Sequence, residues 1–537
     1  MTFDVSLTSA RTTAVGLHAS RWREQQTIER MWDKDPTVWA DPATPEISDR
    51  LGWLDAPNRS RSLIGTIGEL HNQAVDEGIE DIVLCGMGGS SLAPEVFAAT
   101  LPRNSASPKL TVIDSTHPNA VVAVAAATDP GTTWYVVASK SGGTIETMSL
   151  FRFFWRQAAE ALTDPGSHFI AITDPGTSLE ALATERGFRS VVNADPNVGG
   201  RYSALTAFGL VPTGLIGADL GRLLDGAQKA ADLCGPTKPL EENPGFEMGV
   251  ALAEAARSGE DKAQFLCGAP LSTLGVWIEQ LVAESTGKEG LGIVPIDGGQ
   301  LLDERGDTVV VGIGASVADE SVIELVVVDP YDVGGAMFIL EFAVAVAGSV
   351  LGINPFDQPD VQLAKELAAA AMDGGADASG PRLPQATDTR WVTELVAAFD
   401  DPSPSYVSVQ AYISQTAQNV ASLAELRAAL TAQSGAHVTV GFGPRFLHST
   451  GQLHKGGPAG GVYLQITDEP TPSLPIPETD TTFNNLIAAQ AVGDRTALAD
   501  RDRAVIAVDL GTDVAGGLAT MLHRLQAEPA HHPTSTP

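Results

Sequence analysis

Basic residues and cysteines are scarce in this chain of 537 residues. Its 33 lysines and arginines face 66 aspartates and glutamates, which gives a formal net charge of -33. Such a charge repels the phosphates of nucleic acids and anionic membrane surfaces, so we expect neither as a partner. The three cysteines (Cys85, Cys234 and Cys267) are odd in number and lack metal-ligand spacing, which argues against a disulfide framework and against a metal cluster.

Long apolar segments are also lacking. The N-terminus has no apolar core of signal-peptide length, and no run approaches the roughly 18 apolar residues of a membrane span. A hydrophobic fraction of 43% with a charged fraction of 18% is typical of globular proteins. We therefore expect a cytoplasmic protein with two or three domains.

Short β-branched segments alternate with Ala- and Leu-rich helical stretches along most of the chain. The strands expected in the first series are 81–87, 110–115, 133–140, 168–174 and 189–195. A second series has strands at 264–269, 308–314 and 322–329 and a helical stretch at 337–351. A third has strands at 437–443, 461–467 and 504–510 and a helical stretch at 483–492. This alternation predicts an α/β fold of parallel sheets with crossover helices.

Composition then suggests where the domains begin and end. Four tryptophans among charged residues indicate that the N-terminal segment forms helices laid against a larger body. Residues 368–390 are rich in Ala, Gly, Asp and Pro, which is typical of a linker. The last dozen residues are expected to be disordered. The expected parts are an N-terminal helical segment 1–60, α/β domains 61–235 and 236–372, a linker 373–390 and a C-terminal α/β segment 391–537.

A glycine-rich turn, CGMGGSS, spans residues 85–91 directly after the first expected strand. Its glycines allow a sharp turn that brings backbone N–H groups to a helix start, where anions bind. The third glycine of the dinucleotide fingerprint is missing, and the next strand does not end on an acidic residue in the expected way. A tight turn without a ligand explains this motif equally well.

A second turn, SKSGGTIET, spans residues 139–147 and places three hydroxyls, from Ser139, Ser141 and Thr144, above a helix start. It is the better phosphate cradle of the two. Helix capping alone would account for only one or two of these hydroxyls. Two such turns at the carboxyl ends of strands in one sheet favour a ligand crevice there.

Three more motifs follow in order: NVGGRYSALTAFGL (197–210), AESTGKEG (283–290) and NPFDQPDVQLAK (354–365). Together with the two turns, this series resembles the phosphoglucose isomerase family over roughly residues 50–372. The resemblance implies two flavodoxin-like sugar-isomerase (SIS) domains with parallel sheets, with a smaller C-terminal α/β segment after them. It also implies the interconversion of glucose 6-phosphate and fructose 6-phosphate through a cis-enediolate, in glycolysis and gluconeogenesis, with no cofactor and no metal.

The resemblance also implies roles for individual residues. Glu284 would carry the proton between C2 and C1, Arg201 would stabilise the enediolate, and Lys365 would act near the ring oxygen. The expected substrate-binding residues are Gly89, Ser90, Ser139, Lys140, Ser141, Thr144, Glu146, Gly200 and Gln358. Of these, Ser90, Ser139, Ser141 and Thr144 would hold the phosphate.

The residue patterns alone give weaker statements. Glu284 follows Leu281 by three residues on the apolar face of an expected helix, where it could equally be a solvated helix end. Pro359 suits the first turn of a helix, and two turns separate Gln358 from Lys365, so the pair would share one face. An amphipathic helix with a solvated lysine is the plain alternative.

One expected residue is missing from its usual place: residues 285–436 contain no histidine, although the family has one soon after the catalytic glutamate. The segment FLHSTGQ (446–452) is similar to the sequence around that histidine in the compact bacterial enzymes of the family. The C-terminal segment resembles the corresponding part of transaldolase-fused phosphoglucose isomerases, so we assign ring opening to His448. A purely structural His448 is the alternative, and His454 or Lys455 could contact the ligand instead. The family resemblance further implies a homodimer, with His448 reaching the site within its own chain or from the neighbouring subunit.

Two other functions remain open from the sequence. A phosphomannose isomerase, or a dual phosphoglucose/phosphomannose isomerase, would use the same base and phosphate cradle. A non-catalytic sugar-phosphate sensor would use SIS domains for binding alone. The presence of Glu284, Arg201 and Lys365 argues against a sensor, which has no need of a base.

Overall fold

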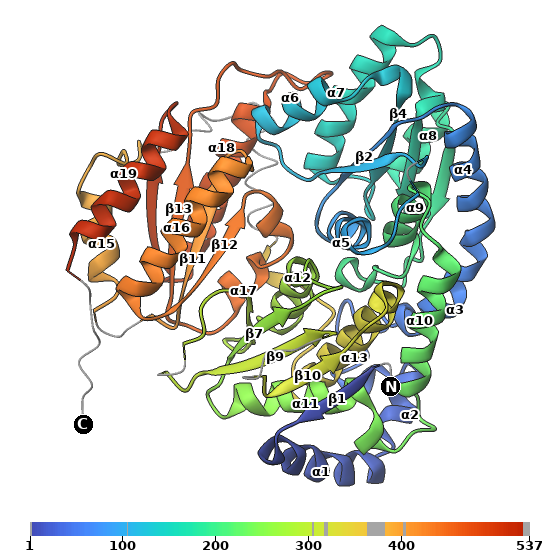
Figure 1. The fold of residues 1–537 in the computed structure, drawn as a ribbon, viewed down its shortest axis with the longest axis vertical. Helices are drawn as coiled ribbons and strands as arrows, with labels where there is room; N and C mark the ends of the chain where they lie inside the picture. Colours follow the sequence, from blue (N-terminus) through green and yellow to red (C-terminus); the bar gives the residue numbers. More distant parts are fainter. Residues whose placement is uncertain are drawn as a thin grey trace. The chain divides into compact units, whose positions relative to one another are not determined.

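The structure, a computed structural model, describes residues 3–104, 106–302, 305–315, 321–361, 382–400 and 404–529. The chain divides into two compact units. Unit 1 consists of Met1–Ile113, Thr128–Gly299 and Arg305–Gln358, and unit 2 consists of Asp114–Ala127, Gln300–Glu304 and Pro359–Pro537. Unit 1 contains two of the sheets drawn in Figure 1, and unit 2 contains the third.

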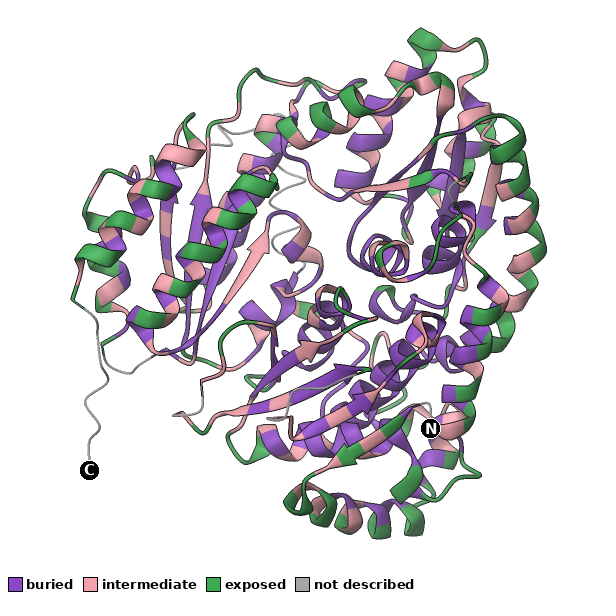
Figure 2. Ribbon diagram, viewed as in Figure 1, coloured by how far each residue is buried: buried purple, intermediate pink, exposed green. Residues whose placement is uncertain are grey.

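The first sheet of unit 1 has five parallel strands in the order β3-β2-β4-β5-β6. Its strands are β2 (Asp81–Gly86), β3 (Lys109–Ile113), β4 (Thr133–Ala138), β5 (Phe169–Thr173) and β6 (Ser190–Asn193). The helices that follow or flank them are α4 (Ile64–Asp76), α5 (Leu92–Thr100), α7 (Ile145–Ala161), α8 (Ser178–Glu185) and α9 (Ala207–Leu215). Every residue of β4, TWYVVA, is buried, as expected of a strand with both faces covered. Figure 2 shows this contrast between purple strands and the partly green surface of α4.

The second sheet of unit 1 has the order β1-β10-β9-β7-β8. Its strands are β1 (Asp4–Leu7), β7 (Lys262–Cys267), β8 (Val294–Asp297), β9 (Thr308–Gly314) and β10 (Ile323–Val326). Strand β1 runs antiparallel to β10, while the other pairs are parallel. The helices of this half are α10 (Leu220–Leu233), α11 (Pro244–Arg257), α12 (Gly275–Thr286) and α13 (Val333–Leu351).

Helix α13 is the central helix of unit 1. It packs against α10, α11 and α12, and sixteen consecutive residues, Val333–Gly348, are buried. Among the described residues, one segment, Pro330–Leu351, is long and apolar enough to cross a membrane by length and composition, and 89% of the window tested is buried inside the protein. The buried core helix of a globular unit can have the same length and composition, and α13 is such a helix in unit 1.

The N-terminal segment contains α1 (Ser9–Glu24), α2 (Thr27–Trp32) and α3 (Ala56–Arg59) and, in addition, strand β1. Its tryptophans pack on unit 1 as expected: the rings of Trp22 and Phe246 are 5.1 Å apart, and those of Trp53 and Phe338 are 5.8 Å apart. The sequence analysis described this segment as helical and missed β1. The strand has only four residues, and its partner β10 lies more than 300 residues further along the chain.

Unit 2 is built on a sheet of four parallel strands in the order β12-β11-β13-β14. The strands are β11 (Tyr406–Tyr412), β12 (His437–Phe442), β13 (Gly461–Thr467) and β14 (Ala504–Asp509). Its helices are α6 (Pro118–Ala127), α15 (Arg390–Ala397), α16 (Ala417–Ser434), α17 (Gly451–Gly456), α18 (Phe483–Ala499) and α19 (Val514–Ala527). A hydrophobic core of its own includes Trp391, Leu430 and Met521.

The predicted α/β class, with parallel sheets and a smaller C-terminal α/β part, is confirmed. The exact domain boundaries stay predictions, as does the linker 373–390, because residues 362–381 lie outside the described residues. Residues 530–537 of the expected disordered tail also lie outside, whereas the first two of its dozen residues are helical, because α19 continues to Ala527.

Candidate active site

The two glycine-and-hydroxyl turns lie next to each other on unit 1. They follow β2 and β4, which pair in parallel with Gly86 opposite Ala138. The chain leaves β2 for β3 on one side and reaches β4 on the other, so the two turns flank the switch point of the sheet. Ligands of open α/β sheets bind outside the carboxyl ends of strands at such a point. The two turns therefore lie at the switch point of this sheet, and the ligand crevice expected there stays a prediction.

Gly89 lies in the first turn, where its backbone meets the backbone of Gly200. A Cβ atom at residue 89 would collide with the Gly200 carbonyl group. Ser203 contacts both glycines, since its Oγ donates to the Gly200 oxygen at 2.6 Å and lies 3.4 Å from the Gly89 oxygen. Ser90 is buried beside Gly89. The glycine is thus required by the close approach of two segments more than 100 residues apart.

The second turn closes on itself through its hydroxyls. Ser139 Oγ and Thr144 Oγ1 are 2.9 Å apart, and the Thr144 backbone N–H donates to Ser139 Oγ at 3.4 Å. Ser141 is exposed, and its Oγ accepts from the Gly143 N–H. Thr144 is the N-cap residue of α7, but its side chain makes no cap hydrogen bond. The Thr144 hydroxyl is therefore oriented by Ser139 and does not cap a backbone N–H group of α7.

Two charged residues of the same turn are placed differently. Lys140 pairs with Asp174 and donates to the Pro196 oxygen at 3.1 Å, so its ammonium group is held within unit 1. Glu146 is buried in the first turn of α7. A carboxylate there is favoured by the helix dipole. Both residues belong to the turn, and their contact with a substrate stays a prediction.

Arg201 is almost completely enclosed, with 2% of its surface exposed. Its Nε donates to Ser285 Oγ at 2.8 Å, and its Nη2 donates to the backbone oxygens of Pro355 and Asp357 at 2.8 and 2.7 Å. The remaining nitrogen, Nη1, lies 3.5 Å from Oε2 of Glu284. The short 3-10 helix Gly200–Tyr202 carries the residue, and the guanidinium is fixed by atoms from two other segments, 284–285 and 355–357.

Glu284 lies in the last turn of α12 and is 6% exposed. Its Oε2 accepts a hydrogen bond from Gln280 Nε2 at 3.2 Å, one helical turn earlier, and faces Arg201 Nη1. Among the described residues, no hydrogen bond is made to the other carboxylate oxygen, Oε1. The sequence could not decide between a solvated helix end and a buried base, and the carboxylate is buried.

Lys288 was not among the site residues expected from the sequence. It is 3% exposed, and its ammonium group donates to the oxygens of Asn354 (2.5 Å) and Asp357 (2.6 Å) and to the Asp357 carboxylate (2.6 Å). Burial, together with the nearby Arg201 charge, lowers the pKa of Lys288 to about 7, against the opposing effect of Asp357 and Glu284.

Arg201 and Lys288 therefore hold the same loop. Both donate to the Asp357 oxygen, directly before Gln358, which is partly exposed. Lys288 belongs to the AESTGKEG motif and Asp357 to the NPFDQP motif, so both residues stood in motifs that the sequence analysis had singled out. The pairing was not visible there, because 69 residues separate the two partners.

The remaining predicted catalytic residues lie elsewhere. Lys365 lies outside the described residues, and only the short 3-10 turn Pro359–Val361 of its expected helix is described. His448 ends the 3-10 turn Arg445–His448 of unit 2 and is partly exposed. The two neighbours suggested as alternatives are internal: His454 bonds Gln410 and Ser408, and Lys455 pairs with Asp494 at 2.5 Å, fully buried. A ligand contact from either would require breaking these bonds, so His448 remains the candidate in this segment.

Comparison with known proteins agrees with this arrangement. The family model of phosphoglucose isomerase matches residues 58–326. The chain belongs to the phosphoglucose isomerase family. Glucose-6-phosphate isomerase of Rubrobacter xylanophilus is 26% identical over 395 residues, which cover 61% of this chain and 90% of that protein. The enzyme of the same name from Thermus thermophilus is 27% identical over 390 residues, covering 61% and 92%.

Two solved structures have a similar fold. A hypothetical protein of Thermus thermophilus has a TM-score of 0.58 at 25% identity, over 68% of this chain and 99% of the other. A glucose-6-phosphate isomerase of Chlamydia trachomatis has a TM-score of 0.58 at 20% identity, over 69% and 88%. The matched family region includes both turns, Arg201 and Glu284, and ends before the sheet of unit 2 begins. The likeness of that C-terminal part to transaldolase-fused family members stays a prediction.

Proposed function

We propose that this member of the phosphoglucose isomerase family interconverts glucose 6-phosphate and fructose 6-phosphate through a cis-enediolate. The observation that carries the proposal is the buried Glu284 carboxylate 3.5 Å from the Arg201 guanidinium, in the same unit as two hydroxyl-rich turns. A base beside a fixed cation suits a reaction that removes a proton and builds up negative charge. The relatives named above carry the name of this activity.

Proton transfer is assigned to Glu284 Oε1. Gln280 and Arg201 engage the other oxygen, Oε2, so the carboxylate is held in one orientation while Oε1 is left for the substrate. It would take the proton from C2 and return it to C1. Arg201 Nη1 is the guanidinium nitrogen not fixed by Ser285 or by the loop carbonyls, and it would face the enediolate oxygens.

Phosphate binding is assigned to the two turns. Ser139, Ser141 and Thr144 would donate hydroxyl hydrogen bonds, and Ser90 would add a fourth from the neighbouring turn. The glycine at 89 leaves room for the phosphate to approach backbone N–H groups. These local donors must work against an overall charge of -33, which repels an anionic substrate.

Ring opening is assigned to His448 with Lys365, and Gln358 would bind the open chain. These assignments rest on the family resemblance of the motifs that contain them. We further propose a cytoplasmic homodimer, the assembly that the family resemblance implies for a histidine contributed by a second subunit. A sugar phosphate is then the small-molecule partner.

The alternatives are less well supported. A phosphomannose or dual isomerase would use the same residues, but the two relatives compared above are both named for glucose 6-phosphate. A sensor without catalysis would not need a buried base that is oriented by Gln280. Competition between mannose 6-phosphate and glucose 6-phosphate in a turnover assay separates the first alternative from our proposal.

The test is the exchange of the C2 hydrogen of glucose 6-phosphate with deuterated solvent. Glu284→Gln keeps the shape of the side chain and removes the base, so turnover and exchange should both fall at least about 100-fold. Binding of the phosphate should change little. Glu289→Gln, an exposed acid five residues further on, is the matched control and should retain wild-type exchange. Near-normal exchange in the Glu284 variant would reject the assignment.

A further inference from the structure

Lys288 and Arg201 are two buried cations of unit 1 that share one acceptor. The backbone oxygen of Asp357 lies 2.6 Å from Lys288 Nζ and 2.7 Å from Arg201 Nη2. The carboxylate of the same residue contacts Lys288 at 2.6 Å. Among the described residues, the carboxylate within 4.0 Å of the Arg201 guanidinium is that of Glu284. Lys288 and Arg201 therefore divide two carboxylates between them, although both contact the same residue.

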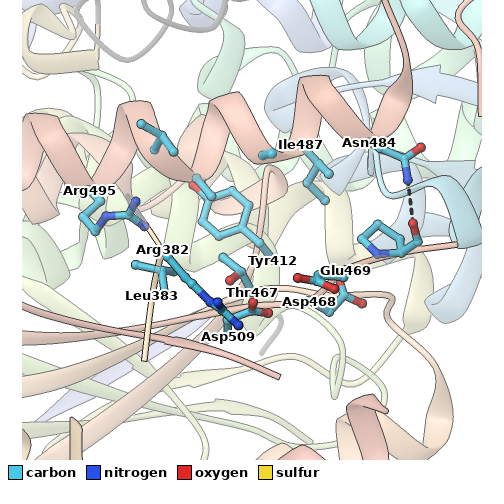
Figure 3. Close-up of a pocket in the computed structure, with 14 residues that line it drawn as sticks. Arg382, Leu383, Tyr412, Thr467, Asp468, Glu469, Asn484, Ile487, Arg495 and Asp509 are labelled. Carbon is cyan, nitrogen blue, oxygen red and sulfur yellow. Dashed lines mark hydrogen bonds between the residues drawn. The ribbon is translucent and has the colours of Figure 1, made fainter. Parts of the chain in front are cut away.

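Cations enclosed in unit 2 have acceptors of their own. Lys455 pairs with Asp494 at 2.5 Å, and both side chains are fully buried. The half-buried Arg495, at the left of the unit 2 pocket drawn in Figure 3, donates to Gln465 Oε1 at 2.6 Å. Lys288 differs from these two cations, because its acceptor is also held by the guanidinium proposed to stabilise the enediolate.

The backbone turns sharply to bring Lys288 to this place. Helix α12 ends at Thr286, and Lys288 and Leu291 exchange two backbone hydrogen bonds, of 3.0 and 2.8 Å, across a two-residue turn. At the corners of this turn Glu289 and Gly290 have φ angles of 56° and 77°, in the left-handed region that a residue with a side chain rarely adopts. Such strain persists where the surrounding contacts over-determine the backbone, and it is concentrated at functional sites.

The Asp357 carboxylate is a competitor for Arg201. Nη2 of Arg201 already contacts the backbone oxygen of Asp357, and 25% of the Asp357 side chain is exposed, so a change of rotamer can bring its carboxylate to the guanidinium. Arginine binds a carboxylate more strongly than a carbonyl oxygen, and frequently through two nitrogens. The contact of Nη1 with Glu284, at 3.5 Å, is the longer and weaker one. An unpaired Asp357 would therefore draw Nη1 away from Glu284.

We propose that Lys288 is a positioning residue for the isomerase reaction. It holds the Asp357 carboxylate away from Arg201, so that Arg201 Nη1 stays beside Glu284 and faces the enediolate. Lys288 acts through Asp357 and Arg201 and makes no contact with the substrate itself. The inference rests on the function proposed above, and it adds a residue that the reaction needs for geometry rather than for proton transfer.

The charge of Lys288 should then appear in the pH dependence of turnover. Burial and the nearby Arg201 charge lower the pKa of Lys288 to about 7, against the opposing effect of Asp357 and Glu284. These three residues are the charged groups that face the ammonium, from three segments of unit 1. Below this pKa the ammonium neutralises Asp357. As the pH rises through it, Asp357 loses its counter-charge and competes for Arg201, so kcat should fall.

Steady-state kinetics at pH 6.5 tests the inference with two variants. Lys288→Met leaves Asp357 unpaired and should lower kcat at least about tenfold, with little change in KM, because a small misplacement of a catalytic group is costly and the phosphate turns are untouched. Lys288→Met/Asp357→Asn leaves no carboxylate to compete for Arg201, so most of the wild-type kcat should return. Lys238→Met, an exposed lysine of the same unit, is the matched control and should behave like the wild type.

The double variant separates positioning from a purely structural role. If Lys288 only shaped the loop through its hydrogen bonds, removal of the Asp357 carboxylate as well could not restore turnover. A double variant as slow as Lys288→Met would therefore overturn the inference. Wild-type kcat in Lys288→Met would overturn it too.

A second measurement needs no change at Lys288, and it decides the matter if the Lys288 variants do not fold. The wild-type kcat should fall as the pH rises through about 7, whereas Asp357→Asn, which has no competing carboxylate, should lack this fall. Groups elsewhere titrate alike in both proteins. A flat wild-type profile, or the same fall in both proteins, would overturn the inference.

The function itself is tested separately by C2 exchange in Glu284→Gln. Near-normal exchange in that variant rejects the isomerase assignment, and the role of Lys288 falls with it. Loss of exchange in Glu284→Gln together with unchanged kcat in Lys288→Met rejects the positioning role alone.

Discussion

The buried ammonium group of Lys288 should give unit 1 an alkaline gain in stability. In the unfolded chain this group keeps its proton up to a pKa near 10.5, whereas in the folded chain the pKa is about 7. Between these two values the unfolded chain binds more protons, so the stability of the folded state rises with pH. The charged groups facing Lys288 are Arg201, Asp357 and Glu284, and the net direction is set by burial and Arg201.

The size of the effect follows from the pKa difference. From pH 7 to pH 9.5 the gain is about 2.9 kcal/mol, because the slope approaches about 1.4 kcal/mol per pH unit only between the two pKa values and is half of that at pH 7. Unit 1 has roughly 340 residues, and its unfolding entropy of about 0.7 kcal/mol/K converts this gain into a rise of about 4 °C in Tm. Lys288→Met removes the titrating group, so the variant should lack this rise. Other titrating groups affect both proteins equally.

Scanning calorimetry of the two proteins at pH 7, 8, 9 and 9.5 measures the difference. Lys238→Met replaces an exposed lysine of unit 1 and should follow the wild-type curve. Asp357→Asn removes the carboxylate that favours the charged form of Lys288, so the rise in Tm should begin at lower pH. This variant replaces Lys288→Met in the comparison if Lys288→Met does not fold. Parallel curves for wild type and Lys288→Met would refute the reasoning.

Three further predictions concern other residues. Gly89→Ala should reduce kcat/KM by at least about tenfold, because its Cβ forces the Gly200 turn away, while Gly65→Ala, with open space around its Cβ, should be neutral in the same assay. Glu341 is fully buried, and no described residue makes a hydrogen bond to its carboxyl oxygens. Burial raises the pKa of Glu341 well above the usual value, so stability falls as pH rises above about 4.5, and Glu341→Met should raise Tm more at pH 8 than at pH 5. An equal Tm difference at both pH values would contradict this. His448→Ala should impair turnover of cyclic glucose 6-phosphate yet retain deuterium exchange on an open-chain analogue, and loss of both activities would remove the ring-opening role.

The strands that the sequence predicted best are those with continuous β-branched or apolar runs. The ranges 308–314 and 461–467 coincide with β9 and β13 residue for residue. Strand β11, YVSVQAY, was missed although all seven of its residues are buried. Its Ser408 and Gln410 look like surface residues in the sequence, and they are buried because His454 provides their hydrogen-bond partner.

For the candidate site, the sequence by itself determined the local parts. The glycines and hydroxyls of the two turns, and the position of Glu284 near the end of a helix, follow from neighbours within a few residues, because turn and helix chemistry is local. The motif order then indicated the family. That is why the residues proposed for catalysis could be named before any contact was known.

Only the tertiary structure decided which of these parts meet. Three contacts of the site each join segments 69 to 111 residues apart. They are the Arg201–Glu284 contact, the approach of Gly89 to Gly200 and the hydrogen bonds of Lys288 to the Asp357 loop. The sheet of unit 2 likewise depends on the chain crossing from β12 to the far side of β11, where β13 lies. No local pattern encodes such pairings, because they are fixed by the packing of whole sheets and helices into the core of each unit, and a residue's burial and pKa follow from that packing.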